Sequence, residues 1–210
     1  MTLIQRAAKF AEMVHDGQMR KYTDEPYIVH PEAVAGVVAS VSNDANVIAA
    51  AWLHDVVEDT EVLISEIDDL FNSRVAKLVS EVTNVTTHAD GNRDTRKQLE
   101  RNHLARACPD AKTIKLADIL DNVPSIVEHD PNFGKVYVAE KQLLLPLLRE
   151  GDRTLYRKAH KLLFGIDPDI YLVCPSYAGP CLSCEKYYTG VCDHIYKFVS
   201  IEWRAAHKRQ

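Results

Sequence analysis

Apolar residues recur at intervals of three and four positions along most of the chain, which is the pattern of amphipathic helices. No segment shows the strict alternation of apolar and polar residues that is typical of a half-buried strand. The pattern predicts an all-α bundle of about seven to nine helices. The predicted helices cover residues 2–16, 31–41, 44–58, 63–70, 72–84, 94–106, 109–127, 132–150 and 152–165.

Two of these predicted helices begin with residues that favour a helix start. Pro31 suits a first turn, where its missing N–H would have no partner, and Asp44 can cap the helix that follows it. The segments 17–29 and 86–93 break the helical pattern and are rich in loop-forming residues. Loops on a helical scaffold commonly carry binding groups, so we expect ligand contacts there.

The composition changes near residue 168. From there to the end, the chain mixes Pro, Gly, Tyr and Cys before one last helical pattern. We therefore predict a helical domain over residues 1–167 and a small Cys-rich C-terminal extension over residues 168–210. Aromatic residues of this extension could form an interface, so a homo-oligomer is compatible with the sequence.

The overall charge narrows the class of partner. The 210 residues carry a formal net charge of −5, which gives no general attraction to nucleic acid or to an anionic membrane. We expect neither as a partner, whereas a small-molecule ligand is compatible with this charge. No apolar stretch is long enough to cross a bilayer, and the N-terminal segment mixes both charge signs rather than forming a signal peptide. These features favour a cytoplasmic location.

Four titratable residues interrupt the apolar segment "AAAWLHDVVEDT", residues 49–60: His54, Asp55, Glu58 and Asp59. Positions four apart on a helix share a face, so His54 would lie above Glu58 and Asp55 above Asp59. A solvated helix face is one interpretation. The flanking residues are almost all apolar, however, and burying unpaired charges is costly. The segment therefore favours a metal site.

Two further residues are candidates to complete such a site. His30 stands at the start of a predicted helix in "EPYIVHPEAVA", and Asp118 interrupts the apolar helix "TIKLADILDN". Asp118 and Asn122 are four apart and share a face, whereas Asp121 is expected to be turned away. Taken singly, His30 and Asp118 are equally compatible with capping or hydrogen-bonding roles.

The segments "HDGQMRKYTDEPYIVHP", "LHDVVEDT" and "KLADILDN", in this order, resemble the HD-domain metal-dependent phosphohydrolases. The resemblance covers roughly residues 1–165 and is closer to the alarmone hydrolase domain of the RelA/SpoT homologues, in particular the stand-alone small alarmone hydrolases. It implies an HD-domain helical bundle, a single Mn²⁺, and removal of the 3′-pyrophosphate from guanosine tetra- or pentaphosphate.

The resemblance also implies roles for individual residues. It implies four metal ligands, namely His30, His54, Asp55 and Asp118. It implies that Glu58 and Asp59 handle the attacking water. It further implies substrate contacts for Arg20, Lys21 and Asn122. Two imidazoles and two carboxylates are a donor set that suits Mn²⁺.

The chain departs from the family pattern at Asp121, where the family commonly has His or an aromatic residue. A negative charge beside the nucleoside would disfavour a tetraphosphate or require a different base contact. The segment 86–106 offers four candidate phosphate partners, although an exposed helix of mixed charge is an alternative description; they are Arg93, Arg96, Lys97 and Arg101.

Four cysteines gather in the C-terminal extension with the spacing C-x6-C-x2-C-x7-C, namely Cys174, Cys181, Cys184 and Cys192. A structural Zn²⁺ site, reduced or redox-sensitive thiols, and disulfides are the three interpretations. For a cytoplasmic protein, zinc is favoured over disulfides.

Two other functions are compatible with the same residues. One is a phosphohydrolase of another nucleotide, for example an NADPH 2′-phosphatase or a nucleotidase. The other is a catalytically silent module that senses a nucleotide. The pair Glu58 and Asp59 argues against the sensor, because a sensor needs no water-activating carboxylate beside its metal.

Overall fold

The computed structural model of the protein describes residues 1–166, which form helices and no strand. The α-helices are α1 (Leu3–Val14), α2 (Val29–Ala39), α3 (Ala45–Trp52), α4 (Val56–Asp59), α5 (Ile64–Leu70), α6 (Ser73–Val82), α7 (Arg93–Ala105), α8 (Pro109–His129), α9 (Pro131–Leu144) and α10 (Arg153–Phe164). Two 3₁₀ helices, η1 (His88–Asp90) and η2 (Leu145–Leu148), lie between them. The predicted helical fold is thereby confirmed for this part of the chain.

Polar side chains fix the starts of several helices. The Thr2 hydroxyl accepts the backbone N–H of Gln5, whose side chain accepts the backbone N–H of Thr2, so both groups are satisfied at the start of α1. The predicted cap at Asp44 is confirmed, because its carboxylate accepts the backbone N–H of Asn46 at 2.8 Å. Asn72 caps α6 in the same way. Each contact satisfies an N–H that has no partner within its helix.

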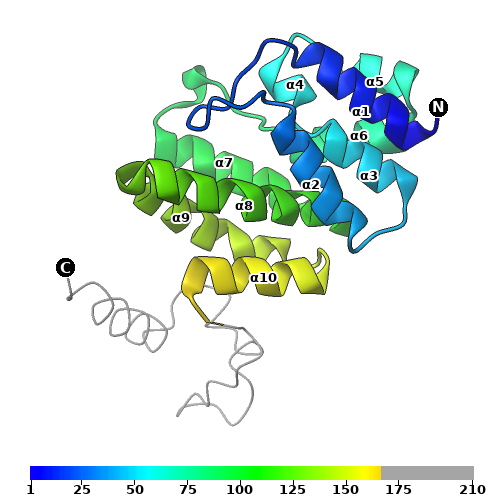
Figure 1. Ribbon diagram of the computed structural model, residues 1–210. Coiled ribbons are helices and arrows are strands. Elements are labelled where there is room, and N and C mark those ends of the chain that lie inside the picture. The colour runs from blue at the N-terminus through cyan, green and yellow to red at the C-terminus, as the bar shows by residue number, and fades with distance from the viewer. Residues whose placement is uncertain (167–210) are drawn as a thin grey trace, which may run out of the picture. The chain divides into compact units, whose positions relative to one another are not determined.

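Helix α8 lies at the centre of the unit Met1–Tyr156, where it packs against α2, α3, α6 and α9 (Figure 1). Its residues from Ala111 to Ile119 are all buried, although Lys115 and Asp118 are among them. Gly134 allows α9 to approach α8 closely, since a Cβ atom at this position would lie 3.0 Å from the Cα of Val127. The polar residues of α8 are thus held in a tightly packed interior.

The predicted helix over residues 44–58 is wrong as a single element, because a turn separates α3 from α4. The backbone N–H groups of Leu53 and Val56 each bond to a carbonyl three residues earlier, at 3.1 Å, which tightens the chain. The imidazole of His54 donates from Nδ1 to the carbonyl of Ala51, at 2.8 Å, and so satisfies a carbonyl freed by the end of α3. His54 and Asp55 therefore lie in a turn and not on a continuous helical face.

The predicted helix over residues 132–150 is also interrupted. Helix α9 ends at Leu144, and Pro146 lies in the following 3₁₀ helix η2. Proline has no N–H and its ring clashes with the preceding turn, so an α-helix cannot continue unchanged through this position. The predicted single helix is therefore two elements, α9 and η2, and both pack against α8.

No helix within residues 1–166 is long and apolar enough to cross a membrane. The predicted Cys-rich extension, residues 168–210, lies outside the described residues. The predicted boundary at residue 167 stays a prediction.

Candidate metal centre

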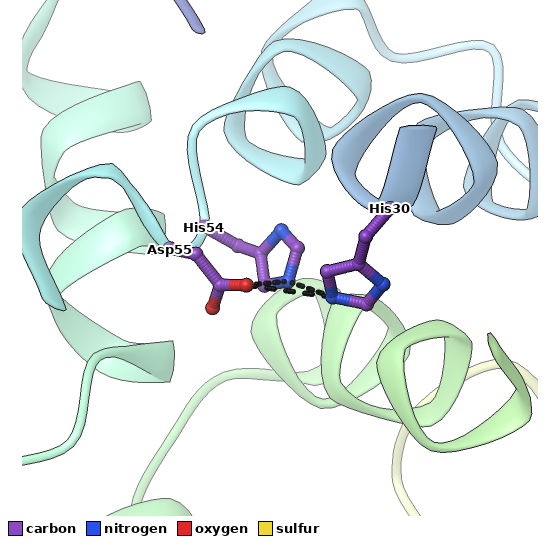
Figure 2. A group of neighbouring side chains, drawn as sticks. All are labelled: His30, His54 and Asp55. Carbon is purple, nitrogen blue, oxygen red and sulfur yellow. Dashed lines mark hydrogen bonds and ion pairs between the residues drawn. The ribbon is translucent and has the colours of Figure 1, made fainter. Parts of the chain in front are cut away.

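Three separate parts of the fold supply the predicted metal ligands. His30 lies in the first turn of α2, His54 and Asp55 lie in the turn between α3 and α4, and Asp118 lies in the middle of α8. Figure 2 shows the imidazoles of His30 and His54 with the Asp55 carboxylate directed toward them. The structure therefore brings together all four residues that the sequence singled out.

The potential ligand atoms lie within a few ångströms of one another. The two Nε2 atoms of His30 and His54 are 3.2 Å apart. Asp55 Oδ2 lies 3.1 Å from His54 Nε2 and 3.4 Å from His30 Nε2, and Asp118 Oδ1 lies 3.5 Å from His30 Nε2. His30 and His54 are each 2% exposed and Asp118 is 3% exposed. These atoms form a buried cluster of two nitrogens and two carboxylate oxygens.

The other ring nitrogen of each histidine is already bonded. His54 Nδ1 donates to a backbone carbonyl, and His30 Nδ1 donates to Asp121 Oδ2 at 2.6 Å. A neutral imidazole has one N–H, so these bonds leave the Nε2 lone pair of each ring directed at its partner. Two lone pairs at this distance repel unless a proton or a metal ion lies between them. The donor set, its tautomers and its spacing therefore fit a divalent metal ion.

The electrostatics of the cluster agree with a site for positive charge. Burial lowers the pKa of His30, but the hydrogen bonds that its ring donates to Asp118, Asp121 and Asp55 outweigh this effect and raise that pKa to about 11. Burial raises the pKa of Asp55, but the histidines His54 and His30 more than offset it, so the net pKa lies well below the ordinary value. The carboxylates therefore stay ionised and attract a proton or a metal ion.

Three residues that sequence reasoning missed orient the carboxylates. The Tyr27 hydroxyl donates to Asp55 Oδ2 at 2.5 Å, and the Lys115 ammonium lies 2.8 Å from Asp118 Oδ2. Asn84 lies after α6 and donates from Nδ2 to Glu58 Oε1 at 2.5 Å. Lys115 stands three residues before Asp118 in a predicted helix, a spacing that could have indicated their contact, whereas Tyr27 and Asp55 are 28 residues apart.

Glu58 and Asp59 lie in α4, directly after the turn that holds His54 and Asp55. Burial raises the pKa of Glu58, and the charge of Asp55 adds to that effect. Burial and the charge of Asp55 likewise raise the pKa of Asp59. A carboxylate with a raised pKa is a stronger base, which suits proton transfer near neutral pH.

The expectation that Asp121 is turned away from the cluster is wrong. Its Oδ2 atom accepts hydrogen bonds from His30 Nδ1 and, at 3.0 Å, from the guanidinium of Arg20. Position 121 reaches His30 because α2 packs directly against α8. Burial raises the pKa of Asp121, but His30 and then Arg20 lower it below the ordinary value, so the carboxylate is ionised.

Of the three residues predicted to contact substrate, two bond to carboxylates of α8 and the third lies beside an aromatic ring. Arg20 is held by Asp121, and the Asn122 side chain donates to Asp118 Oδ1. The Lys21 ammonium lies 5.7 Å from the centre of the Phe133 ring, and the Arg93 guanidinium lies 5.1 Å from the same ring. Two cations thus flank one aromatic side chain.

The four basic residues of α7 have different environments. Arg93 forms two hydrogen bonds with Glu140, Arg96 bonds to His88 Nδ1 at 2.6 Å, and Lys97 pairs with Glu100. These three contacts agree with the description of a helix of mixed charge. Arg101 forms no ion pair with any residue of the described chain. The predicted zinc ligands Cys174, Cys181, Cys184 and Cys192 lie outside the described residues.

The chain is similar in sequence to proteins that are named as guanosine-3′,5′-bis(diphosphate) 3′-pyrophosphohydrolases. It is 39% identical over 150 residues to a probable guanosine-3′,5′-bis(diphosphate) 3′-pyrophosphohydrolase of Synechocystis, which covers 69% of this chain but only 20% of that protein. It is 38% identical to the guanosine-3′,5′-bis(diphosphate) 3′-pyrophosphohydrolase MESH1 of Xenopus tropicalis, over 61% of this chain and 72% of that one.

A solved structure supports the same relationship. The metazoan orthologue of SpoT, described as hydrolysing ppGpp, matches with a TM-score of 0.69 and 29% identity over 77% of this chain and 94% of its own. Residues 7–144 match the family described as the HD domain, which is more than half of the chain. The buried His-Asp cluster lies within this matched region, and the chain belongs to the HD domain family.

Proposed function

We propose that the protein is a metal-dependent phosphohydrolase that removes the 3′-pyrophosphate from guanosine tetra- or pentaphosphate. The observation that carries the proposal is the convergence of the two histidine Nε2 atoms with the Asp55 and Asp118 carboxylates in one buried cluster. The relatives named as guanosine 3′-pyrophosphohydrolases support this substrate class. The chain spans only 20% of the length of the Synechocystis protein and 72% of the Xenopus protein.

We assign the metal to His30, His54, Asp55 and Asp118, and we propose Mn²⁺ as the ion. When bound, a divalent ion supplies charge neutralisation of the phosphate and lowers the pKa of coordinated water. The residues around the ligands keep them oriented: a backbone carbonyl and Asp121 fix the two imidazoles, while Tyr27 and Lys115 hold the two carboxylates. Such supporting contacts hold ligands in position before the ion binds.

Glu58 and Asp59 are the residues proposed to handle the attacking water. The water oxygen forms a bond to the phosphorus attached to the nucleotide 3′ oxygen, and the bond between that phosphorus and the 3′ oxygen breaks. One proton of the water passes to a carboxylate of this pair, and that proton is then returned to the departing 3′ oxygen, which leaves as a hydroxyl. The products are GDP or GTP and pyrophosphate. The raised pKa of both carboxyl groups supports the role of base.

Substrate contacts are proposed for Arg20, Lys21 and Asn122. Arg20 bonds to Asp121 and Asn122 bonds to Asp118, two of the carboxylates of α8, so both side chains lie where nucleotide and metal would meet. Lys21 lies beside the Phe133 ring and is exposed, which leaves its ammonium available for a phosphate.

The test is to incubate the Mn²⁺-loaded protein with guanosine tetraphosphate, guanosine pentaphosphate, NADPH and ordinary nucleotides, and to quantify pyrophosphate and phosphate separately. Pyrophosphate release from the alarmones alone would support the proposal. Phosphate released from NADPH would instead favour the alternative phosphatase. Binding of a nucleotide with no product from any substrate would favour the sensing module.

The Asp59→Asn variant is the matched control for this assay. It should keep the metal bound and lose turnover, which would separate release by this site from release by a contaminant. A cytoplasmic location, a homo-oligomer and a structural Zn²⁺ remain predictions.

A further inference from the structure

A pocket lies between α7, α8 and α9, beside the proposed metal centre. Its charged lining comes from all three helices: Lys97, Glu100 and Arg101 of α7, Lys115 of α8, and Glu140 and Lys141 of α9. We call this group the lysine pocket. Four cationic side chains face two carboxylates, so the lining carries an excess of positive charge.

Two residues of the lining connect the lysine pocket to the catalytic residues. Lys115 contributes to the pocket and lies 2.8 Å from Asp118 Oδ2. Asn84 also lines the pocket and bonds to Glu58 Oε1. The pocket therefore begins one side chain away from the proposed ligand Asp118 and from the proposed base Glu58.

The carboxylates of the pocket do not neutralise all of its cations. Glu100 pairs with Lys97, while Glu140 is held by two hydrogen bonds from Arg93 on α7. Lys141 lies with its ammonium 4.6 Å from the centre of the Tyr137 ring, which is a weaker partner than a carboxylate. Within residues 1–166, neither Lys141 nor Arg101 forms an ion pair.

Lys141 is in an unfavourable environment when the pocket holds no anion. Burial lowers its pKa, and the neighbouring charges of Lys115 and Lys97 lower it further, to about 8. A partly buried ammonium among other cations lowers the stability of a fold, whereas methionine would fill similar space without charge. Groups that reduce stability in this way are commonly found at binding sites.

We propose that the lysine pocket binds a diphosphate group, and that during turnover it receives the pyrophosphate released at the metal centre. Pyrophosphate is multiply charged, so it can accept hydrogen bonds from several ammonium and guanidinium groups at once. Lys115 lies between the two sites and can contact an oxygen at either end of such a group. That the bound group is the pyrophosphate released by hydrolysis rests on the proposed function. That the lysine pocket binds pyrophosphate does not depend on it.

The direct test is calorimetric titration of the full-length, metal-free protein with inorganic pyrophosphate. The wild type should bind, and Lys141→Met and Arg101→Met should each weaken binding by about 10-fold or more, as expected for loss of one charge-assisted hydrogen bond. Lys135→Met is the matched control, because Lys135 is an exposed lysine on the same helix. This variant should bind pyrophosphate as tightly as the wild type does.

Unfolding does not confound this comparison, since Lys141→Met is expected to melt at a higher temperature than the wild type. The proposal is overturned if the wild type does not bind pyrophosphate, or if Lys141→Met binds it as tightly as Lys135→Met does. Parallel titrations with GDP and with inorganic phosphate identify the source of the diphosphate. Tight binding of GDP that depends on Lys141, without binding of pyrophosphate, would assign the pocket to the 5′-diphosphate and overturn the proposed role.

Turnover measurements separate this proposal from the proposed function. If the enzyme hydrolyses the alarmone, pyrophosphate should inhibit the wild type and Lys135→Met equally and inhibit Lys141→Met about 10-fold less strongly. If pyrophosphate binds through Lys141 but no alarmone is hydrolysed, the lysine pocket stands and the proposed function fails. If the alarmone is hydrolysed and Lys141→Met leaves pyrophosphate affinity unchanged, only the lysine pocket fails.

Discussion

His30 Nδ1 lies 2.6 Å from Asp121 Oδ2, so a carboxylate from α8 fixes the orientation of an imidazole from α2. The same oxygen accepts a hydrogen bond from Arg20, at 3.0 Å. Asp121 therefore connects a proposed substrate-binding residue to a proposed metal ligand. The resemblance to alarmone hydrolases leads one to expect His or an aromatic residue here, so this connection is a feature of this chain.

Asp121→Ala should weaken Mn²⁺ binding by about 10- to 100-fold, because His30 loses the partner that fixes its tautomer. Asp121→Asn should have a smaller effect, since an amide oxygen still accepts the Nδ1–H. The measurement is the free Mn²⁺ signal in electron paramagnetic resonance during titration of metal-free protein. Asp69→Asn, at an exposed position of α5, is the control. Equal affinities for Asp121→Ala and this control would show that Asp121 does not position His30.

Asp59→Asn and Glu58→Gln should each lower kcat by about 10²- to 10⁴-fold, the range for loss of a general base. Metal affinity should change by only a few-fold at most, because neither residue is among the four proposed ligands. Rates and Mn²⁺ affinities are measured on the same preparations, with the exposed neighbour Glu61→Gln as the control. If one of these variants keeps the wild-type rate, the residue that it replaces does not take the proton from the water.

Divalent metal should stabilise the folded protein through the cluster around His54. At a free Mn²⁺ concentration 100 times the dissociation constant, the free energy of unfolding should rise by about 2.7 kcal/mol. Denaturant titrations with and without Mn²⁺, after treatment with a chelator, measure this change. His54→Ala should abolish it. Stabilisation that persists in His54→Ala would place the metal elsewhere in the chain.

Lys141→Met should raise the free energy of unfolding at pH 7 by about 1–3 kcal/mol, because the pKa of Lys141 in the folded protein is depressed. Below pH 8 the folded and unfolded states both carry the proton, so the cost of burying the charge is fully present. As the pH rises from about 8 toward 10.5, the folded state loses the proton first and that cost disappears.

The difference in unfolding free energy between Lys141→Met and the wild type should therefore be largest below pH 8 and should shrink toward zero near pH 10.5. Comparing the two proteins cancels the titration of all other groups. Denaturant titrations across this pH range provide the measurement. A difference that is independent of pH would mean that Lys141 is not desolvated in the folded protein.

The helices were predictable from the sequence because the spacing of apolar residues is a local property, and only the interruptions were missed. The break at Leu53 depends on a hydrogen bond between the His54 side chain and a backbone carbonyl, which no hydrophobic pattern encodes. The segment with His54 and Asp55 stood out because titratable residues among apolar ones are unusual, whereas the full set of four ligands was implied by the resemblance to the HD-domain phosphohydrolases. Asp121 was wrongly expected to turn away, and Asn84 was missed. Their partners, His30 and Glu58, lie on helices that are distant in the sequence.

The residues of the metal cluster are far apart in the sequence, and this separation affects the order of folding. His30 and His54 are 24 residues apart, and His30 and Asp121 are 91 residues apart, so the cluster closes only when distant parts of the chain have met. Such long loops are entropically costly to close and tend to form late. On the ribosome, the segment up to His54 would emerge long before α8 and would hold the ion weakly. Metal capture is thus expected as a late event that locks a nearly finished fold.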